Sequence, residues 1–289
     1  MISNTESFQP RRTFIFSPAL NPGMYFKALR SGADIVCLEL EDGVAPKDKD
    51  QARKNAIAIF ENEEGLEDRI ERVLRINCVR SEAGLSDVQA IISSCTPPPV
   101  IMMPKVLGPE EVVWLDDLLT ERGHATRLHV IIETCQGLEN VAQIARASKR
   151  LEALFFGGFD MAAELRCEMA WEPLVYARSR LVHAAASEGL DAIDVPYLDL
   201  NDEVGMLREA DLSKALGFSG KGAIHPKQIP TLNNVFTPSS EELRHARQIV
   251  DAFTEADTGL LVVDGKLIEK PVIREMQRKL SVAKKIDKE

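Results

Sequence analysis

Short apolar segments that alternate with helix-forming segments recur along the whole of this 289-residue chain. The apolar segments are rich in aliphatic and β-branched residues and lack a polar residue at every second position. This pattern is typical of strands that are covered on both faces, as in a parallel sheet. The predicted strands are Thr13–Ser17, Ile35–Leu40, Val73–Asn77, Val100–Met103, Leu128–Ile132, Ala153–Phe156, Asp191–Ile193 and Gly222–Ile224.

The segments between these strands have the apolar periodicity of helices. Proline opens several of them, at a helix position where its missing N–H group costs no hydrogen bond. Regular alternation of strands and helices predicts an α/β fold with a parallel sheet, and eight units favour a closed TIM (β/α)₈ barrel over an open sheet. The predicted helices are Pro22–Ser31, Lys47–Phe60, Leu85–Ser94, Pro109–Glu121, Gly137–Ala147, Pro173–Ser187 and Asp202–Leu216.

The strand–helix alternation stops after His225. We therefore expect residues 1–230 to form the barrel and residues 231–289 to form a C-terminal helical extension. The extension is predicted to begin with a helix that is capped by Ser239 or Ser240 and runs to about Ala256. A hairpin of Leu260–Asp264 and Lys266–Ile268 follows, with its turn at Asp264 and Gly265. A charged helix is predicted after Pro271.

Charge and cysteine content narrow the compartment and the partners. A formal net charge of −10 argues against nucleic acid or an anionic membrane surface as the main partner. The five cysteines are scattered and form no C-x-x-C pair, which predicts a reducing cytoplasm and no disulfide framework. The first dozen residues lack the apolar core of a signal peptide, and no run approaches the roughly 18 apolar residues of a membrane helix.

Polar side chains follow nearly every predicted strand at the point where the strand ends. A (β/α)₈ barrel gathers the C-terminal ends of all its strands on one face, where such barrels build their active sites. These side chains are therefore expected to meet in one cleft, although they lie far apart in the sequence. They are Glu41, Asp42, Arg75, Asn77, Lys105, Glu133, Asp160, Asp194 and His225.

The strongest pair among them is Glu133 with Asp160, which follow neighbouring strands. Two carboxylates on adjacent strand ends suit Mg²⁺, because this ion prefers oxygen ligands and keeps positions open for substrate. Gly157 and Gly158, just before Asp160, leave room for a ligand to approach the backbone. The alternative interpretation is that both acids cap the helices that follow them. The sequence alone leaves the two interpretations equally balanced.

Arg75 lies inside the third predicted strand, where a charge is costly unless it is paired or faces an anion. The sequence favours an anion contact at the barrel mouth, and a buried salt bridge with Glu41 is the alternative. Glu39, Glu41 and Asp42 crowd the end of the second strand. Acidic side chains at such short separation must be solvated, paired with a cation or close to a metal ion. At least one of the three is therefore expected to face the site.

Other polar residues fit ordinary structural roles better than catalytic ones. Lys105 could form a Schiff base, but beside several acids it is better interpreted as an ion-pair partner. His225 is similarly expected to be a hydrogen-bonding residue at a strand end. Arg11, Arg12, Lys27 and Arg30 would form a solvated surface or meet a phosphate group at the barrel rim. The sequence contains no nucleophile-elbow or phosphate-loop pattern.

Several segments, in this order and across nearly the whole chain from about Arg12 to Val272, resemble the citrate lyase β-subunit-like proteins. These belong to the HpcH/HpaI aldolase superfamily, which includes malyl-CoA and citramalyl-CoA lyases. The segments are Leu38–Pro46, Arg75–Asn77, Met103–Val106, Ile132–Thr134, Tyr176–Arg180, Ala192–Asp194 and Gly220–Pro226.

The resemblance implies a TIM barrel in which Glu133 and Asp160 hold Mg²⁺ and Arg75 contacts the reacting oxygens of the substrate. Glu41 and Asp42 are counted with Arg75 among the predicted catalytic residues, because at least one acid at the end of the second strand is expected to face the site. Coenzyme A, as part of the substrate, would be held by Phe16, Lys27 and the backbone at Asp194 and Val195.

The resemblance further implies a homotrimer or homohexamer in which a C-terminal lid from a neighbouring subunit supplies the general acid/base. Coenzyme A lyases of the family carry an Asp at the position that is Glu269 here, and Phe159 replaces an acid common in the family. The implied function is Mg²⁺-dependent cleavage or formation of a 3-hydroxyacyl-CoA, such as malyl-CoA or citramalyl-CoA, with release of an acyl-CoA and a 2-oxo acid. Alternatives are a malyl-CoA thioesterase, a citrate lyase β subunit, a CoA-independent 2-oxo acid aldolase and a non-catalytic CoA-ester-binding barrel.

Overall fold

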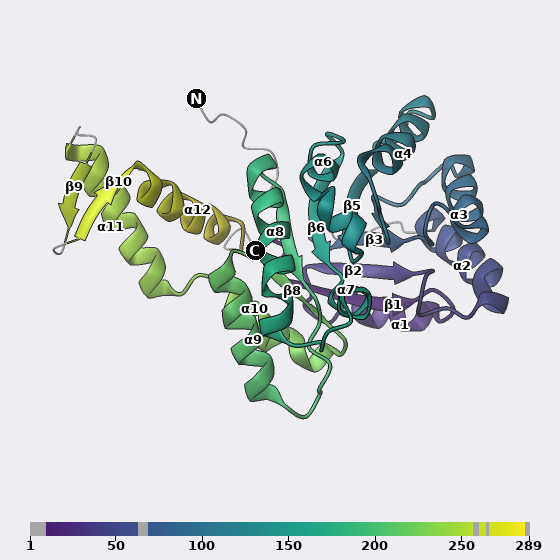
Figure 1. Cartoon of the computed structure of the whole chain (residues 1–289), viewed down its shortest axis with the longest axis horizontal. Helices are drawn as coiled ribbons and strands as arrows, with labels where there is room; N and C mark the ends of the chain where they lie inside the picture. The colour runs from purple at the N-terminus through teal and green to yellow at the C-terminus, as the bar shows by residue number, and fades with distance from the viewer. Residues whose placement is uncertain (1–9, 63–68, 257–259, 264–265, 287–289) are drawn as a thin grey trace. The chain divides into compact units, whose positions relative to one another are not determined.

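Parallel strands close into a barrel in which each strand pairs with the next along the chain and β8 pairs with β1 (Figure 1). The computed structural model describes residues 10–62, 69–256, 260–263 and 266–286. The predicted TIM barrel is confirmed. Its strands are β1 (Thr13–Pro18), β2 (Ile35–Glu39), β3 (Glu71–Arg75), β4 (Val100–Met103), β5 (Arg127–Ile132), β6 (Leu151–Phe156), β7 (Asp191–Asp194) and β8 (Gly220–Ala223).

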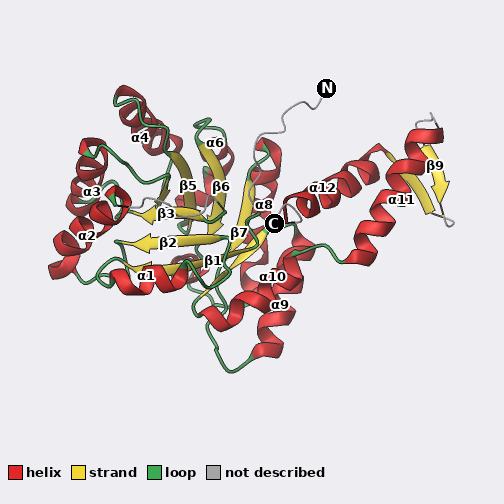
Figure 2. Cartoon of the chain, turned by 180° about the vertical axis from the view of Figure 1, so that it is seen from behind, coloured by secondary structure: helices red, strands yellow, loops and turns green. Residues whose placement is uncertain are grey.

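Helices follow the strands and lie on the outside of the barrel (Figure 2). The barrel unit includes α1 (Pro22–Ala28), α2 (Lys49–Glu61), α3 (Glu82–Ser93), α4 (Pro109–Glu121), α5 (Cys135–Glu139), α6 (Val141–Ala145), α7 (Gly158–Leu165), α8 (Trp171–Glu188) and α9 (Glu203–Leu216), with short 3₁₀ turns at Pro46–Asp48 and Pro226–Gln228 and the start of α10 (Ile229–Phe236).

Several elements begin or end a few residues from the expected bounds, β3 and β6 among them, and two of the differences have a clear structural reason. The last strand begins at Gly220, two residues before the prediction, because its glycines allow close packing that propensity does not capture. A Cβ atom at Gly220 would lie 2.0 Å from the backbone oxygen of Arg11. The single helix predicted between β5 and β6 is divided at Asn140, whose side chain instead donates to the backbone oxygen of Leu107 at 2.7 Å.

Inward-facing apolar side chains fill the barrel and support its mouth. Phe14 and Phe155 pack edge to face with ring centroids 5.1 Å apart, and Phe16 packs on Phe14 at 4.5 Å. Buried aliphatic residues from the other strands complete this core. Phe14, Phe16 and Phe155 also line the cavity at the mouth of the barrel, so this core continues into the cavity wall.

The opposite, amino-terminal end of the barrel is closed by buried ion pairs. The Arg11 guanidinium contacts Glu71 at 2.7 Å, Asp191 at 3.0 Å and also Glu152. Arg12 pairs with Asp34 at 2.8 Å. The prediction that Arg11 and Arg12 form a solvated surface or meet a phosphate group at the mouth is therefore wrong. Both residues precede β1, so they lie at the end of the strand that is farthest from the mouth.

The C-terminal extension forms a second compact unit. The chain divides into a unit of Arg11–Asn233 and a unit that includes residues 234–289. The second unit contains α11 (Ser240–Ala256), the antiparallel strands β9 (Leu260–Val263) and β10 (Lys266–Glu269), and α12 (Lys270–Ile286).

The extension has a small core of its own, made of Ala246, Ile249, Ile268, Ile273 and Met276. Its first helix is preceded by the predicted serine cap, because the Ser239 hydroxyl accepts from the Glu242 N–H group at 3.1 Å. The predicted hairpin is confirmed, and its turn at Asp264 and Gly265 lies outside the described residues. Within the described part of the chain, no helix is both long and apolar enough to cross a membrane.

Candidate active site

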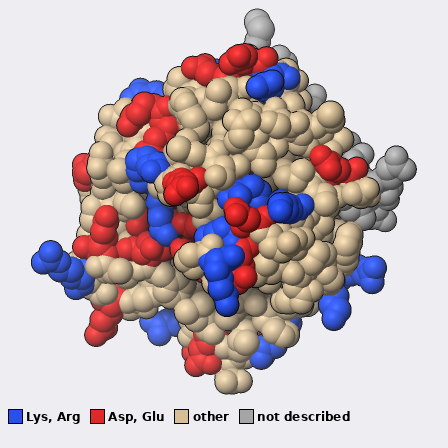
Figure 3. Space-filling view, turned by 90° about the vertical axis from the view of Figure 1, so that its right-hand side faces the viewer, with Lys and Arg blue, Asp and Glu red and all other residues tan. Residues whose placement is uncertain are grey.

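A cavity of about 300 Å³ opens at the carboxyl ends of the strands. Figure 3 views the molecule from the side toward which β1 and β2 point, and acidic and basic side chains gather near the centre of that face. The cavity brings together most of the residues predicted from the strand ends and from the family resemblance. These are Phe16, Asp42, Arg75, Glu133, Asp160, Asp194 and Val195.

Glu133 follows β5 directly and is almost fully buried. Its Oε1 atom accepts a hydrogen bond from the Lys105 N–H group at 2.8 Å. Burial raises the pKa of Glu133 to about 8, and the nearby charges of Glu41 and Asp160 add to this effect. Thr134, rather than Glu133, caps α5. The Glu133 carboxylate therefore does not cap the helix, and a cation beside it would stabilise its charged form and lower its pKa.

Asp160 lies in the first turn of α7 and faces the same cavity. The chain reaches α7 through Gly157, which packs directly under Glu133. A Cβ atom at Gly157 would lie 2.4 Å from the Glu133 Cβ atom and 2.5 Å from its Oε2 atom. The glycine therefore makes room for the Glu133 carboxylate to lie beside the start of the helix that carries Asp160.

Replacing Gly157 with alanine should weaken Mg²⁺ binding, because the Glu133 carboxylate must move away from the new methyl group. We expect the dissociation constant for Mg²⁺ to rise about 10- to 100-fold, as for other changes that misplace a metal ligand. Gly23→Ala is the matched control, since a Cβ atom there meets nothing closer than 3.4 Å. Calorimetric titration of both variants checks the prediction. Equal affinities for the two would contradict it.

Arg75 ends β3 and is held on three sides. Its Nε atom lies 2.5 Å from Glu39 Oε2, its Nη1 atom lies 3.2 Å from Glu41 Oε2, and its guanidinium stacks 4.2 Å from the centre of the Phe16 ring. The salt bridge with Glu41 is thus confirmed, and Arg75 also lines the cavity. Among the described residues, its Nη2 atom has no hydrogen-bond partner, so this atom is free to meet a ligand.

Lys105 is an ion-pair partner, as the sequence favoured. Its ammonium lies 2.7 Å from Glu41 and 3.1 Å from Asp42. Burial alone would lower the pKa of Lys105, but its hydrogen bonds to Glu41 and Asp42 raise it above its ordinary value. A lysine held in the charged form is a poor nucleophile, which argues against a Schiff base. Its backbone has a positive φ of 53°, an uncommon conformation that aims its N–H group at Glu133.

The charge balance of the mouth leaves room for one divalent cation. When all five acids among the described residues there are ionised, their charges exceed those of the three cations by two, and a divalent cation would favour this ionised state by lowering the raised pKa of Glu133. The donors are all carboxylates, which suit Mg²⁺. The acids are Glu39, Glu41, Asp42, Glu133 and Asp160, and the cations are Lys49, Arg75 and Lys105.

Asp194 reaches the cavity from β7, but its side chain is engaged elsewhere. Its carboxylate accepts from Arg178 Nε at 2.9 Å and Lys221 Nζ at 2.8 Å. Burial alone would raise the pKa of Asp194, but these cations hold it below its ordinary value. Lys221 also donates to the backbone oxygen of Val195 at 2.7 Å. The ion pairs thus fix the backbone at Asp194 and Val195 as a rigid wall of the cavity.

Several residues of the barrel unit that were predicted for the site are not among those that line the cavity, namely Lys27, Glu41, Asn77, Lys105 and His225. Lys27 lies on α1 with an exposed side chain. Glu269 is the last residue of β10 in the C-terminal unit, and its side chain is exposed. His225 accepts from the Lys227 N–H group at 3.1 Å and so has the hydrogen-bonding role that the sequence favoured.

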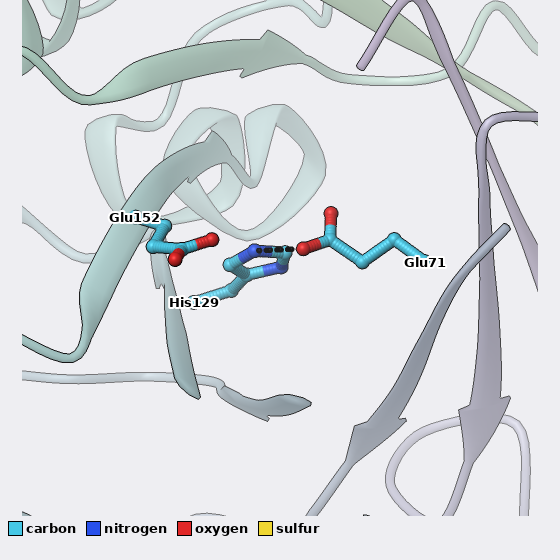
Figure 4. A group of neighbouring side chains, drawn as sticks. All are labelled: Glu71, His129 and Glu152. Atoms are coloured by element: carbon cyan, nitrogen blue, oxygen red, sulfur yellow. Dashed lines mark ion pairs between the residues drawn. The ribbon is translucent and has the colours of Figure 1, made fainter. Parts of the chain in front are cut away.

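A second group of possible metal ligands lies at the other end of the barrel. Glu71, His129 and Glu152 place one ligand atom each within 4.8 Å of one another (Figure 4). However, Arg11 and Arg127 already contact both carboxylates, and Arg127 Nη1 lies 3.2 Å from Glu71 and 2.8 Å from Glu152. A metal ion would have to displace these guanidinium groups. The cluster is therefore best described as an ion-pair plug that closes the barrel.

A (β/α)₈ barrel with converging carboxylates and an arginine at its mouth is the arrangement of a barrel enzyme that uses a metal ion. Comparison with known proteins agrees. Residues 12–226 match the family described as HpcH/HpaI aldolase/citrate lyase, and residues 173–280 match a C–C bond lyase family of the TIM-barrel fold.

The chain is 34% identical to the citrate lyase subunit beta of Haemophilus influenzae over 286 residues, which cover 95% of this chain and 97% of the relative. It is 30% identical to human mitochondrial citramalyl-CoA lyase over 303 residues, which cover 98% and 88% of the two chains. A solved structure of the CitE protein from Mycobacterium tuberculosis with magnesium, acetoacetate and coenzyme A matches with a TM-score of 0.78 and 28% identity, covering 94% of this chain and 98% of that one. The chain belongs to the HpcH/HpaI aldolase/citrate lyase family.

Proposed function

We propose that this protein is a Mg²⁺-dependent carbon–carbon lyase that cleaves or forms a 3-hydroxyacyl-CoA such as malyl-CoA or citramalyl-CoA. The products of cleavage are an acyl-CoA and a 2-oxo acid. The observation that carries the proposal is the meeting of Glu133, Asp160 and Arg75 around one cavity at the barrel mouth. The named relatives, a citramalyl-CoA lyase and a citrate lyase subunit, support the same class of reaction.

Glu133 and Asp160 would hold the metal ion. When bound, Mg²⁺ supplies Lewis acidity toward the carboxylate and hydroxyl oxygens of the substrate. Arg75 presents its free Nη2 atom to the same oxygens, where negative charge develops as the hydroxyl loses its proton. Glu39, Glu41 and Phe16 keep the guanidinium in place, so little reorganisation is needed during the reaction.

In the cleavage direction, the bond between the thioester α-carbon and the hydroxyl-bearing β-carbon breaks. The hydroxyl proton passes to water, and the β-carbon becomes the carbonyl carbon of the 2-oxo acid. The bonding electron pair passes to the α-carbon and forms the enolate of the acyl-CoA, which then takes up a proton. We assign this proton transfer to Glu269 of a neighbouring copy of the chain.

The hairpin that carries Glu269 supports this assignment. Glu269 pairs with Leu260, and Leu267 pairs with Val262, so the four side chains share one face of the β9–β10 sheet. The three apolar members of this face are all more than half exposed, whereas Ile268 on the other face is 5% exposed. An exposed apolar face that ends in a carboxylate suits a lid over the apolar cavity of another copy.

The remaining parts of the proposal follow the family. We assign the coenzyme A portion of the substrate to Phe16, Lys27 and the rigid backbone at Asp194 and Val195, with Glu41 and Asp42 completing the active site. The assembly is a homotrimer or homohexamer that exchanges lids, and its compartment is the cytoplasm. Nucleic acid and membranes are not expected as partners, given the net charge of −10.

A panel of malyl-, citramalyl- and citryl-thioesters, followed by release of 2-oxo acid and of free thiol, tests the proposal. We expect the purified chain to release the 2-oxo acid with Mg²⁺ and to lose this activity with EDTA. Thiol release without an oxo acid would indicate a thioesterase. Activity only with added partner subunits would indicate a citrate lyase subunit, and turnover of free hydroxy acids a CoA-independent aldolase. Substrate binding without turnover would indicate a non-catalytic CoA-ester-binding barrel.

A further inference from the structure

We infer that the cavity selects a 2-oxo acid portion that carries one carboxylate and a small alkyl group, as in pyruvate or 2-oxobutanoate, rather than a second carboxylate, as in oxaloacetate. The inference rests on the proposed function and specifies its substrate class. The named relatives include both a citrate lyase subunit and a citramalyl-CoA lyase, so they do not decide between one and two carboxylates. Citramalate has a hydrogen where citrate has one of its carboxylates.

The distribution of charge is the first basis for this inference. Among the described residues that line the cavity, Arg75 is the only cation, and the other charged members are Asp42, Glu133, Asp160 and Asp194. Lys105 lies nearby, but its ammonium is engaged by Glu41 and Asp42. One carboxylate of the substrate has a partner in Arg75 and the metal ion. A second would lie among acids without a cation of its own.

The apolar surfaces around the predicted metal ligands are the second basis. Next to Glu133, the Ile131 side chain packs on Gly157, where a Cβ atom would lie 2.9 Å from the Ile131 Cγ2 atom. Next to the start of α7, Val195 and Met169 pack on Gly158 at 3.1 and 2.9 Å from the position of such a Cβ atom. Apolar atoms thus approach both strand ends that would hold the metal.

The rim of the cavity continues this apolar surface. Phe159 directly precedes Asp160, lines the cavity and is 38% exposed. Leu198 and Ile224 line the cavity from the loops after β7 and β8 and are also exposed. A methyl or ethyl group on the oxo acid would bury apolar area against these side chains, which favours binding, whereas a carboxylate there would lose its water without gaining a hydrogen bond.

The test measures binding of 2-oxo acids to the full-length protein in Mg²⁺ buffer by calorimetry, with no thioester present. The ligands are pyruvate, 2-oxobutanoate, freshly dissolved oxaloacetate and the chemically stable dicarboxylate 2-oxoglutarate. We expect pyruvate and 2-oxobutanoate to bind at least about tenfold more tightly than either dicarboxylate. Equal or tighter binding of oxaloacetate, or no binding of any of the four acids, would overturn the inference.

A matched pair of variants tests whether the rim sets this preference. Phe159→Arg places a cation at the rim and should improve oxaloacetate binding relative to pyruvate by about tenfold. Leu165→Arg is the control, because Leu165 lies on the same helix, is 43% exposed and does not line the cavity. Equal effects of the two substitutions would overturn the assignment to Phe159. Binding is measured here without turnover. If the protein prefers pyruvate but cleaves no thioester, the proposed lyase activity is wrong, whereas the inferred preference for one carboxylate is supported.

Discussion

Replacing Arg75 with lysine should lower kcat by about 10²- to 10³-fold, the usual loss when one donor to a developing oxyanion is removed. Lysine keeps the positive charge that Glu39 and Glu41 require, but it lacks the planar fork of donors that arginine brings to the cavity lining. Steady-state kinetics with a malyl- or citramalyl-thioester measures the loss. The Mg²⁺ affinity of the variant should stay close to that of the wild type.

The lysine variant is preferred because a neutral substitution of Arg75 would leave Glu39 buried without its partner. Burial already raises the pKa of Glu39 to about 6, in spite of the nearby guanidinium. Removing one member of such a buried pair costs about 3–5 kcal/mol of stability, which would confuse a catalytic defect with unfolding. A variant Arg75→Lys that folds, binds Mg²⁺ and retains full kcat would contradict the role assigned to Arg75.

Replacing Glu269 with glutamine should lower kcat by about 10²- to 10⁴-fold, the range that general acid–base catalysis contributes. Glutamine has nearly the same shape as glutamate but cannot exchange a proton at the α-carbon. Glu269 is exposed at the end of β10, so the substitution should not disturb the fold. Glu275→Gln, an exposed change on α12 of the same unit, is the matched control and should keep wild-type kcat.

Mixing two impaired variants tests whether the lid comes from a neighbouring copy. If Glu269 of one copy serves the cavity of the next, a hybrid oligomer of Arg75→Lys and Glu269→Gln chains contains some sites with both wild-type residues. Random exchange of equal amounts in a cyclic trimer gives about one intact site in four. Recovery of about a quarter of wild-type activity after mixing is expected. If refolded mixtures recover no activity, the lid does not act between copies.

The strand-end carboxylates were predictable from the sequence because the barrel topology itself brings them together. Once the apolar segments were assigned to a parallel barrel, Glu133 and Asp160 had to lie on one face, and the cavity contains both. Arg75 was predictable for a related reason, since a charge inside a strand needs either a partner or a ligand. The structure gives it partners in Glu39 and Glu41 and also leaves it at the cavity.

Features that depend on exact packing were not predictable. The left-handed backbone conformation of Lys105 directs its N–H group toward Glu133. No residue type in the segment Met103–Val106 predicts this conformation. The position of Arg11 before β1 already indicates the end of the barrel away from the mouth, but its partners Glu71, Glu152 and Asp191 come from other strands and could not be identified from the sequence. Lys221 was missed because β8 was placed two residues too late, which left this residue outside the predicted strand.

Titration of the purified protein with Mg²⁺ by calorimetry tests most directly the claim that Glu133 and Asp160 share one divalent ion. We expect one site per chain in the wild type and at least about a 100-fold loss of affinity in Glu133→Gln and in Asp160→Asn. Glu152→Gln, in the ion-pair plug at the other end of the barrel, should bind Mg²⁺ as the wild type does. Undiminished binding in Glu133→Gln together with lost binding in Glu152→Gln would place the metal ion at the amino-terminal end of the barrel and contradict its assignment to Glu133 and Asp160.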